Sequence, residues 1–71
     1  GATMARRDKV KLKIEIEMDN AAFEDGNGYE VARILNQLRE DIDTPDLYEG
    51  DGGTLRDING NKVGFWKVTE E

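Results

Sequence analysis

Carboxylates are the most abundant reactive groups in this chain, with 16 Asp and Glu among 71 residues and no His, Cys or Ser. The absence of these three residue types excludes disulfides, imidazole or thiolate metal ligands, and nucleophilic catalysis by Ser, Cys or His. Catalysis by a carboxylate pair needs two acids held in a cleft, one of them with a raised pKa. Glu15, Glu17 and Asp19 instead fall on one exposed face of a predicted strand. We therefore expect no catalytic residues, no enzyme activity and no cofactor.

Two polar segments have the residue types of calcium-binding loops. Residues 25–28 are similar to the middle of an EF-hand loop, but the alignment places Phe23 and Ile34 where acidic ligands are required. An alignment that starts at Asp57 puts Val68 at the last ligand position and fails as well. A helix cap and a hairpin turn explain both segments, so no metal site is expected.

Glycines before a predicted helix also suggest a phosphate cradle, because a helix N-terminus favours anions. Gly26 and Gly28 occupy such a position. However, Glu24, Asp25 and Glu30 surround it with negative charge, and no Lys or Arg follows at the spacing of a P-loop. We expect no phosphate site there.

Residues 10 to 18 alternate strictly between apolar and charged side chains. A period of two predicts a half-buried strand, with one face against a core and the other in water. A parallel strand buried on both faces would be continuously apolar, so an antiparallel neighbour is favoured. The apolar face carries Val10, Leu12, Ile14, Ile16 and Met18.

A helical period follows the glycine-rich segment. It predicts a helix from residue 28 to residue 41 or 42, with Asn27 as N-cap and Glu30 closing a capping box. Pro45 ends the helix, and Phe23, which precedes it, is expected to plug the edge of the core. The apolar face of the helix consists of Val31, Ile34, Leu35, Leu38 and Ile42.

The C-terminal third predicts an acidic, glycine-rich loop over residues 43–53 and a β-hairpin over residues 54–68. Two registers compete for the hairpin, and they decide which aromatic residue is buried. A two-residue turn at Asn59-Gly60 would place Leu55 and Trp66 on the same face, which makes Trp66 a core residue.

The other register contains a three-residue loop with Asp57 first and Gly60 fourth, the glycine in the left-handed conformation. Phe65 then faces the core, while Trp66 and Val68 lie on the opposite, exposed face. Asp first and Gly fourth is the preferred chemistry of a type I turn closed by a bulge. The sequence therefore favours this second register.

The order strand, helix, strand, strand predicts an α+β fold of β-α-β-β type, a three-stranded, mainly antiparallel sheet with one helix packed on one face. We assign residues 1–3 to a cloning remnant, 4–9 to a basic N-terminal arm, and 10–71 to a single small domain. No run approaches the ~20 apolar residues of a membrane-spanning helix. We expect a cytoplasmic protein with no membrane partner.

Three sequence words carry a resemblance to known proteins. They are IEMDNAAFED (16–25), VARIL (31–35) and LRDINGNKVG (55–64). Together they resemble small uncharacterised proteins of bacteria and of phages or prophages, a family with no known activity. The resemblance implies a bacterial or phage origin.

Charge is unevenly distributed along the chain. Residues 1–13 hold five bases and one acid, net +4, whereas residues 14–71 hold five bases and 15 acids, net −10. A basic arm can contact phosphates, so a nucleic-acid-binding protein is the alternative hypothesis. The acidic body opposes it, because it repels a polyanion. The arm would consist of Arg6, Arg7, Lys9, Lys11 and Lys13.

Protein association is the preferred function. An exposed Trp on a small domain is a typical interface anchor, and an open sheet edge can pair with another chain. We expect a non-catalytic protein-interaction module, with an acidic inhibitor or decoy as a special case, and a homodimer through a sheet edge or the Trp66 face as one form of it. The predicted contact surface consists of Trp66, Val68, Tyr48, Asp46, Glu49 and Asp51.

Overall fold

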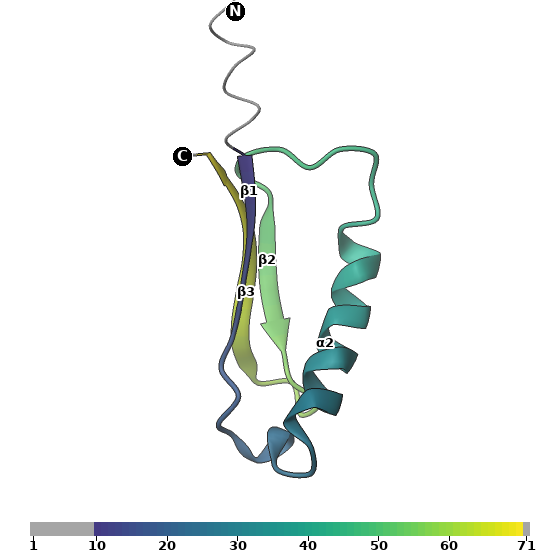
Figure 1. The fold of residues 1–71 in the computed structure, drawn as a ribbon, viewed down its shortest axis with the longest axis vertical. Helices are drawn as coiled ribbons and strands as arrows, with labels where there is room; N and C mark the ends of the chain where they lie inside the picture. The colour runs from purple at the N-terminus through teal and green to yellow at the C-terminus, as the bar shows by residue number, and fades with distance from the viewer. Residues whose placement is uncertain (1–9, 71) are drawn as a thin grey trace, which may run out of the picture.

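The computed structural model describes residues 10–70, so the predicted cloning remnant (1–3) and basic arm (4–9) lie outside the described residues. Within them the chain forms a three-stranded antiparallel sheet of order β1-β3-β2 and one α-helix, which confirms the α+β fold and the β-α-β-β order (Figure 1). The elements are β1 (Val10–Ile16), the 3-10 turn η2 (Ala21–Phe23), α2 (Asn27–Asp41), β2 (Gly52–Arg56) and β3 (Lys62–Glu70).

The strand β1 pairs with β3 along its whole length. Leu12 lies opposite Val68 and Ile14 opposite Trp66, and directly opposed residues share a face of a sheet. The alternating apolar side chains of β1 therefore point to the same side as Trp66 and Val68. This side faces the core, where Phe23 from η2 is buried as predicted.

The hairpin turn has the chemistry that the sequence favours. The Asp57 N–H donates to the carbonyl oxygen of Asn61 (2.9 Å), and the Gly60 N–H donates to that of Asp57 (2.9 Å). Gly60 has a φ of +87°, a conformation that costs a glycine little. The prediction of Asp57 first and Gly60 fourth is confirmed.

A β-bulge next to this turn, however, reverses which residues of β3 face the core. Arg56 lies opposite Lys62, but Leu55, one residue further from the turn, lies opposite Gly64 rather than Val63. This β-bulge moves β3 by one residue, and a shift of one residue turns every later side chain to the other face. The hairpin thus combines the turn of one register with the strand pairing of the other.

The prediction that Trp66 and Val68 form an exposed contact surface is therefore wrong. Their exposed fractions are 7% and 4%, and both belong to the core with Leu55 and Val63. A homodimer through the Trp66 face has no exposed indole to use. Phe65, which the preferred register buries, lies on the other face and is half-buried.

The helix α2 agrees with its predicted range to within one residue. Ile34 and Leu38 bury its inner face. The predicted capping box is wrong, because the N-cap is Gly26 and makes no side-chain capping bond. The Glu30 side chain turns instead toward the β2–β3 turn, where it accepts the N–H of Ile58.

The helix lies beside the half of the sheet that contains the hairpin turn and diverges from the sheet toward its other end (Figure 1). The connection between α2 and β2 arches over that other end. The strand β1 consequently receives less cover than β3: its residues 10–15 are all exposed, whereas Val63, Trp66 and Val68 of β3 are buried. Neither helix within residues 10–70 has the length and apolar character needed to span a membrane.

Burial of Trp66 makes its fluorescence a direct reporter of the register. We expect a blue-shifted emission maximum, poor quenching by iodide, and a red shift on unfolding, because the indole lies in the core. Emission spectra with and without denaturant measure this. A red-shifted, readily quenched spectrum from the native protein would contradict the observed pairing of β2 with β3.

Gly64 is required by the close approach of β1 to β3. A Cβ at Gly64 would collide with the backbone carbonyl oxygen of Glu15. We expect Gly64→Ala to lower the free energy of unfolding by about 1–3 kcal/mol, the usual cost of overpacking. The matched control is Gly28→Ala, whose Cβ would meet no atom within 4 Å and which should leave the urea midpoint unchanged or slightly higher. Equal midpoints for the two variants would contradict the close approach.

Candidate functional site

Glu30 is one of two carboxylates that are buried within residues 10–70, and it joins α2 to the hairpin. Its two oxygens accept hydrogen bonds from Nε and Nη2 of Arg33, each at 3.0 Å. The Ile58 N–H donates to the same carboxylate at 2.8 Å. Arg33 also donates from Nη2 to the carbonyl oxygen of Arg56 at 3.1 Å. The pair Glu30–Arg33 thus fastens the first turns of the helix to the end of β2 and the turn that follows.

Asp57 is the second buried carboxylate, and it organises the hairpin turn. One oxygen accepts the N–H groups of Asn59 (2.9 Å) and Asn61 (2.8 Å). The other oxygen accepts the side-chain amide of Asn20 at 2.8 Å. Asn20 in turn caps η2, since its side-chain oxygen accepts the Ala22 N–H at 2.9 Å. One carboxylate therefore links two segments 37 residues apart.

Hydrogen bonding keeps both carboxylates ionised. The Arg33 guanidinium, with help from the Ile58 N–H, lowers the pKa of Glu30 against the opposing effect of burial. Burial acts to raise the pKa of Asp57, but the bonds from Asn61, Asn20 and Asn59 together lower it. An acid with a lowered pKa is a poor proton donor at neutral pH. These carboxylates are suited to holding the fold together.

Residues 10–70 contain no group of three or more Asp and Glu side chains placed to hold an ion. The two segments compared with EF-hand loops, 25–28 and 57–61, form the start of α2 and the hairpin turn.

The main candidate for a binding surface is an apolar strip along β1. Val10, Leu12 and Ile14 expose 38%, 44% and 42% of their surface. We call these three residues the β1 stripe. They lie on the helix-facing side of the sheet, where the alternation predicts burial, yet nothing in the described structure covers them fully. Met18, just beyond the strand, is 43% exposed as well.

The helix adds to this apolar surface. One flank of α2 faces β2, since Arg33 bonds to Arg56 and Gln37 lines a hollow with Thr54. Helical geometry places Leu35 on the opposite flank, toward β1, and its side chain is 39% exposed. The β1 stripe and Leu35 therefore border the same open side of the molecule.

The predicted acidic loop borders the start of this stripe. Asp46, Tyr48 and Glu49 line a hollow of about 260 Å³ together with Val10, and Tyr48 is 62% exposed. Asp51 is only partly exposed, and its carboxylate accepts the Tyr48 N–H at 2.9 Å. The structure thus brings Asp46, Tyr48 and Glu49 next to the start of β1, whereas the backbone carbonyl oxygen of Asp51 accepts the Val68 N–H at 2.8 Å.

The basic residues of the alternative hypothesis divide into two groups. Arg6, Arg7 and Lys9 lie outside the described residues. Lys11 and Lys13 lie on the face of the sheet opposite to the β1 stripe, and Lys13 pairs with Lys67 across β1 and β3. Lys67, which is not among the predicted basic residues, places its ammonium 5.4 Å from the ring centroid of Phe65.

The buried carboxylates predict how stability depends on pH. Their pKa values are lowered in the folded state, so their ionised forms stabilise the fold. This contribution to the free energy of unfolding is complete above the unfolded-state pKa values of about 4, and it is lost as the pH falls through the lower folded-state values. We expect Asp57→Asn to lower the thermal midpoint at pH 7 and to weaken its decline on acidification from pH 5 to pH 2. Thermal melts across this range measure the effect. The control Asp46→Asn changes an exposed carboxylate, so its thermal midpoint should vary with pH as that of the unmodified protein does. If Asp57→Asn gave the same pH profile as the unmodified protein, the Asp57 carboxylate would have no structural role.

Comparison with known proteins gives no relative from which a site could be transferred. The chain matches no protein-family model, and no curated protein or solved structure shows significant similarity to it. The resemblance to bacterial and phage proteins stays a prediction. Each of the three sequence words has a structural role here. The first word contains Asn20, which caps η2, and the second contains residues 31–35 of α2, directly after Glu30. The third contains the hairpin turn organised by Asp57.

Proposed function

We propose that this protein is a non-catalytic protein-binding module and that the β1 stripe, with Leu35 beside it, is its binding surface. One observation carries the proposal: a strand at the edge of the sheet leaves three successive inward-pointing apolar side chains about 40% exposed. Exposed apolar surface next to polar residues is typical of protein interaction sites. Self-association through a sheet edge is one form of this function.

The chemistry of the remaining residues supports a binding role. The two buried carboxylates are occupied by hydrogen bonds that connect η2, α2 and the hairpin. The other acids within residues 10–70 are exposed or partly exposed, so water screens their charges. Tyr48, beside the start of the stripe, adds a large amphipathic side chain of the kind enriched in interfaces.

A nucleic-acid-binding protein is the second candidate. Lys11, Lys13 and Lys67 share the sheet face opposite the stripe, and Phe65 lies among them. Lysines around an aromatic ring suit a single-stranded nucleic acid, whose phosphates and bases they would contact. The net charge of −10 over residues 14–71 opposes this reading. Fluorescence anisotropy with labelled single-stranded DNA and RNA at 50 mM salt tests it, and no binding there would eliminate it.

A capture experiment tests the preferred function at the stripe. The immobilised protein, Leu12→Asp and Lys62→Glu are each incubated with an extract of the native host. Leu12 is 44% exposed, so an aspartate there should fold but place a charge in the middle of the stripe. We expect at least a tenfold loss of captured partner for Leu12→Asp, while Lys62→Glu, an exposed change at the hairpin end of β3, retains it.

Self-capture counts as binding in this experiment. A tagged copy of the chain is therefore added to the extract, so that a partner identical to the bait is detected. Capture that is equal for Leu12→Asp and Lys62→Glu would contradict the β1 stripe as the binding surface. Absence of any partner, including the tagged copy, would contradict the proposed function.

A further inference from the structure

The strand β1 has an open hydrogen-bonding edge. It lies at one side of the sheet, and within residues 10–70 its only strand neighbour is β3. Antiparallel ladders alternate between residues whose N–H and C=O point to the neighbour and residues whose groups point away. The Glu17 N–H donates to the carbonyl oxygen of Val63 at 2.7 Å. By this alternation Glu15 and Lys13 also bond toward β3.

The even-numbered residues consequently present their backbone groups outward. The N–H and C=O of Leu12, Ile14 and Ile16 point away from β3, to the open side of the edge. Natural edge strands usually block such a row with proline, a bulge or repelling charges. Residues 10–16 contain no proline, and their pairing with β3 runs without a bulge. The charges of β1 therefore influence which strand can pair with this edge.

Those charges follow an order that is complementary to itself. Reading along the chain, Lys11 and Lys13 precede Ile14 and Glu15 follows it. Glu17 comes one residue after β1 ends, where its N–H still bonds to Val63 of β3. Reversing the direction therefore exchanges lysines for glutamates around Ile14. An antiparallel copy of the strand centred on this residue faces each lysine with a glutamate.

We propose that the partner of this edge is a second copy of the chain, whose β1 pairs antiparallel with β1 of the first copy about a twofold axis at Ile14. Ile14 then lies opposite Ile14 of the second copy, and Leu12 lies opposite Ile16. These residues have outward backbone groups, so they form the hydrogen-bonded pairs. Lys13 lies opposite Glu15, and Lys11 opposite Glu17, each pair occurring twice.

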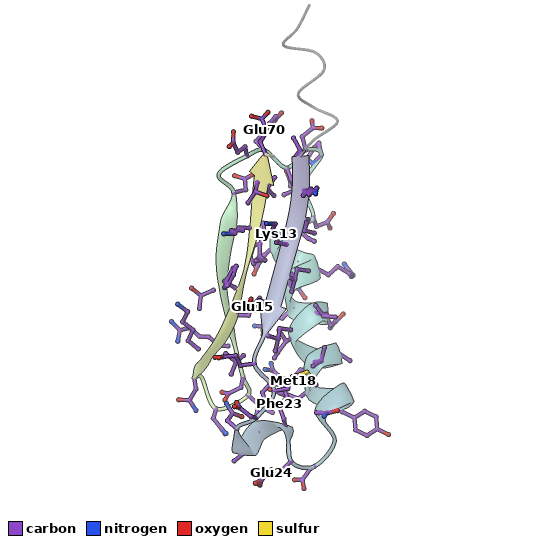
Figure 2. The ribbon with its side chains drawn as sticks, turned by 60° about the vertical axis from the view of Figure 1, so that its left-hand side comes forward. Lys13, Glu15, Met18, Phe23, Glu24 and Glu70 are labelled. Carbon is purple, nitrogen blue, oxygen red and sulfur yellow. The ribbon has the colours of Figure 1, made fainter. Side chains whose placement is uncertain are left out.

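The geometry of the ladder places the ion pairs well. The Lys–Glu pairs fall at non-hydrogen-bonded positions, where opposed Cα atoms approach to about 4.5 Å and side chains are closest. Lys13 and Glu15 follow one another along β1 on the sheet face away from α2 (Figure 2). Opposite charges at such positions stabilise a sheet, and like charges destabilise it.

Neighbouring registers lack this match. The outward backbone groups allow the centre of symmetry to move by one residue. A centre at Lys13 would oppose two copies of Lys13, and a centre at Glu15 would oppose two copies of Glu15. Among these three registers only the one centred on Ile14 contains no like-charge pair over residues 11–17.

The same arrangement covers the apolar surface. A twofold axis perpendicular to the plane of the sheet keeps both helices on one face of a continuous six-stranded sheet. The two β1 stripes then lie side by side under the helices, and the Leu35 flank of each α2 turns toward the seam. The half-exposed side chains of both copies would thus form one shared apolar layer.

A charge-exchange experiment tests this pairing by sedimentation equilibrium at low salt. Lys13→Glu and Glu15→Lys each place like charges opposite each other in their own dimers, so each should weaken dimerisation about tenfold or more. Mixed one to one, they should form a heterodimer, because the glutamates of one chain face the lysines of the other. Lys62→Glu, with the same charge change far from the edge, should dimerise like the unmodified protein.

The outcomes separate this inference from the proposed function on which it rests. A protein that stays monomeric at millimolar concentration overturns the inference, as does a dimer that neither variant weakens or that the mixture fails to restore. If the protein is monomeric but captures another protein in a Leu12-dependent manner, the dimer is wrong and the proposed function is supported. If it neither dimerises nor captures a partner, both the dimer and the proposed function are wrong. Circular dichroism of each variant verifies that it is folded.

Discussion

The bulge between β2 and β3 is the constraint on which the rest of the structure depends. It moves the pairing of Leu55 from Val63 to Gly64 and so turns Trp66 and Val68 to the helix side of the sheet. Trp66 is the largest side chain in the core, and burial of large apolar side chains supplies most of the stability of a small domain. Without the bulge, the core would lose the indole to the solvent-exposed face.

Polar groups hold this register in place. The Asp57 carboxylate binds the turn from inside, while Asn20 and Glu30 connect the turn to η2 and α2. The hairpin turn is therefore fixed at the end of the sheet where the helix begins, and α2 packs most closely there (Figure 1). A helix of 15 residues that is anchored at one end leaves the other end of the sheet with less cover. The exposed β1 stripe follows from where the anchor lies.

Local patterns predicted the elements, whereas pairing between distant segments determined the faces. The helical period from Val31 to Ile42 predicted the helix to within one residue, and the alternation from Val10 to Met18 predicted the strand, which ends two residues earlier, at Ile16. Asp57 with Gly60 predicted the turn. The bulge at Leu55 has no signal of its own in the sequence, because it depends on the fit of β3 against two neighbours. Glu30 has the position of a capping residue in the sequence, but its carboxylate accepts the N–H of Ile58 in the hairpin instead.

The sequence also predicted that the β1 stripe belongs to the core. Alternation shows which side chains point inward, but it does not show whether a helix covers them. The ordering of lysines and glutamates about Ile14 was visible in the sequence, but it acquires meaning only once β1 is known to be an edge strand.

The central claim is that β1 pairs with β1 of a second copy, centred on Ile14. Isotope-filtered NOE spectroscopy on an equal mixture of ¹³C-labelled and unlabelled protein tests it most directly, since it detects only contacts between chains. Opposed residues at non-hydrogen-bonded positions bring their Hα atoms together, so we predict intermolecular cross-peaks between the Hα atoms of Lys13 and Glu15, and of Lys11 and Glu17. Within one extended strand Lys13 and Glu15 are two residues apart and Lys11 and Glu17 are six residues apart, about 7 Å and about 20 Å at roughly 3.3 Å per residue, which is too far for a strong signal within one chain. A concentrated sample without these cross-peaks, or with intermolecular contacts only at other elements, would contradict the claim.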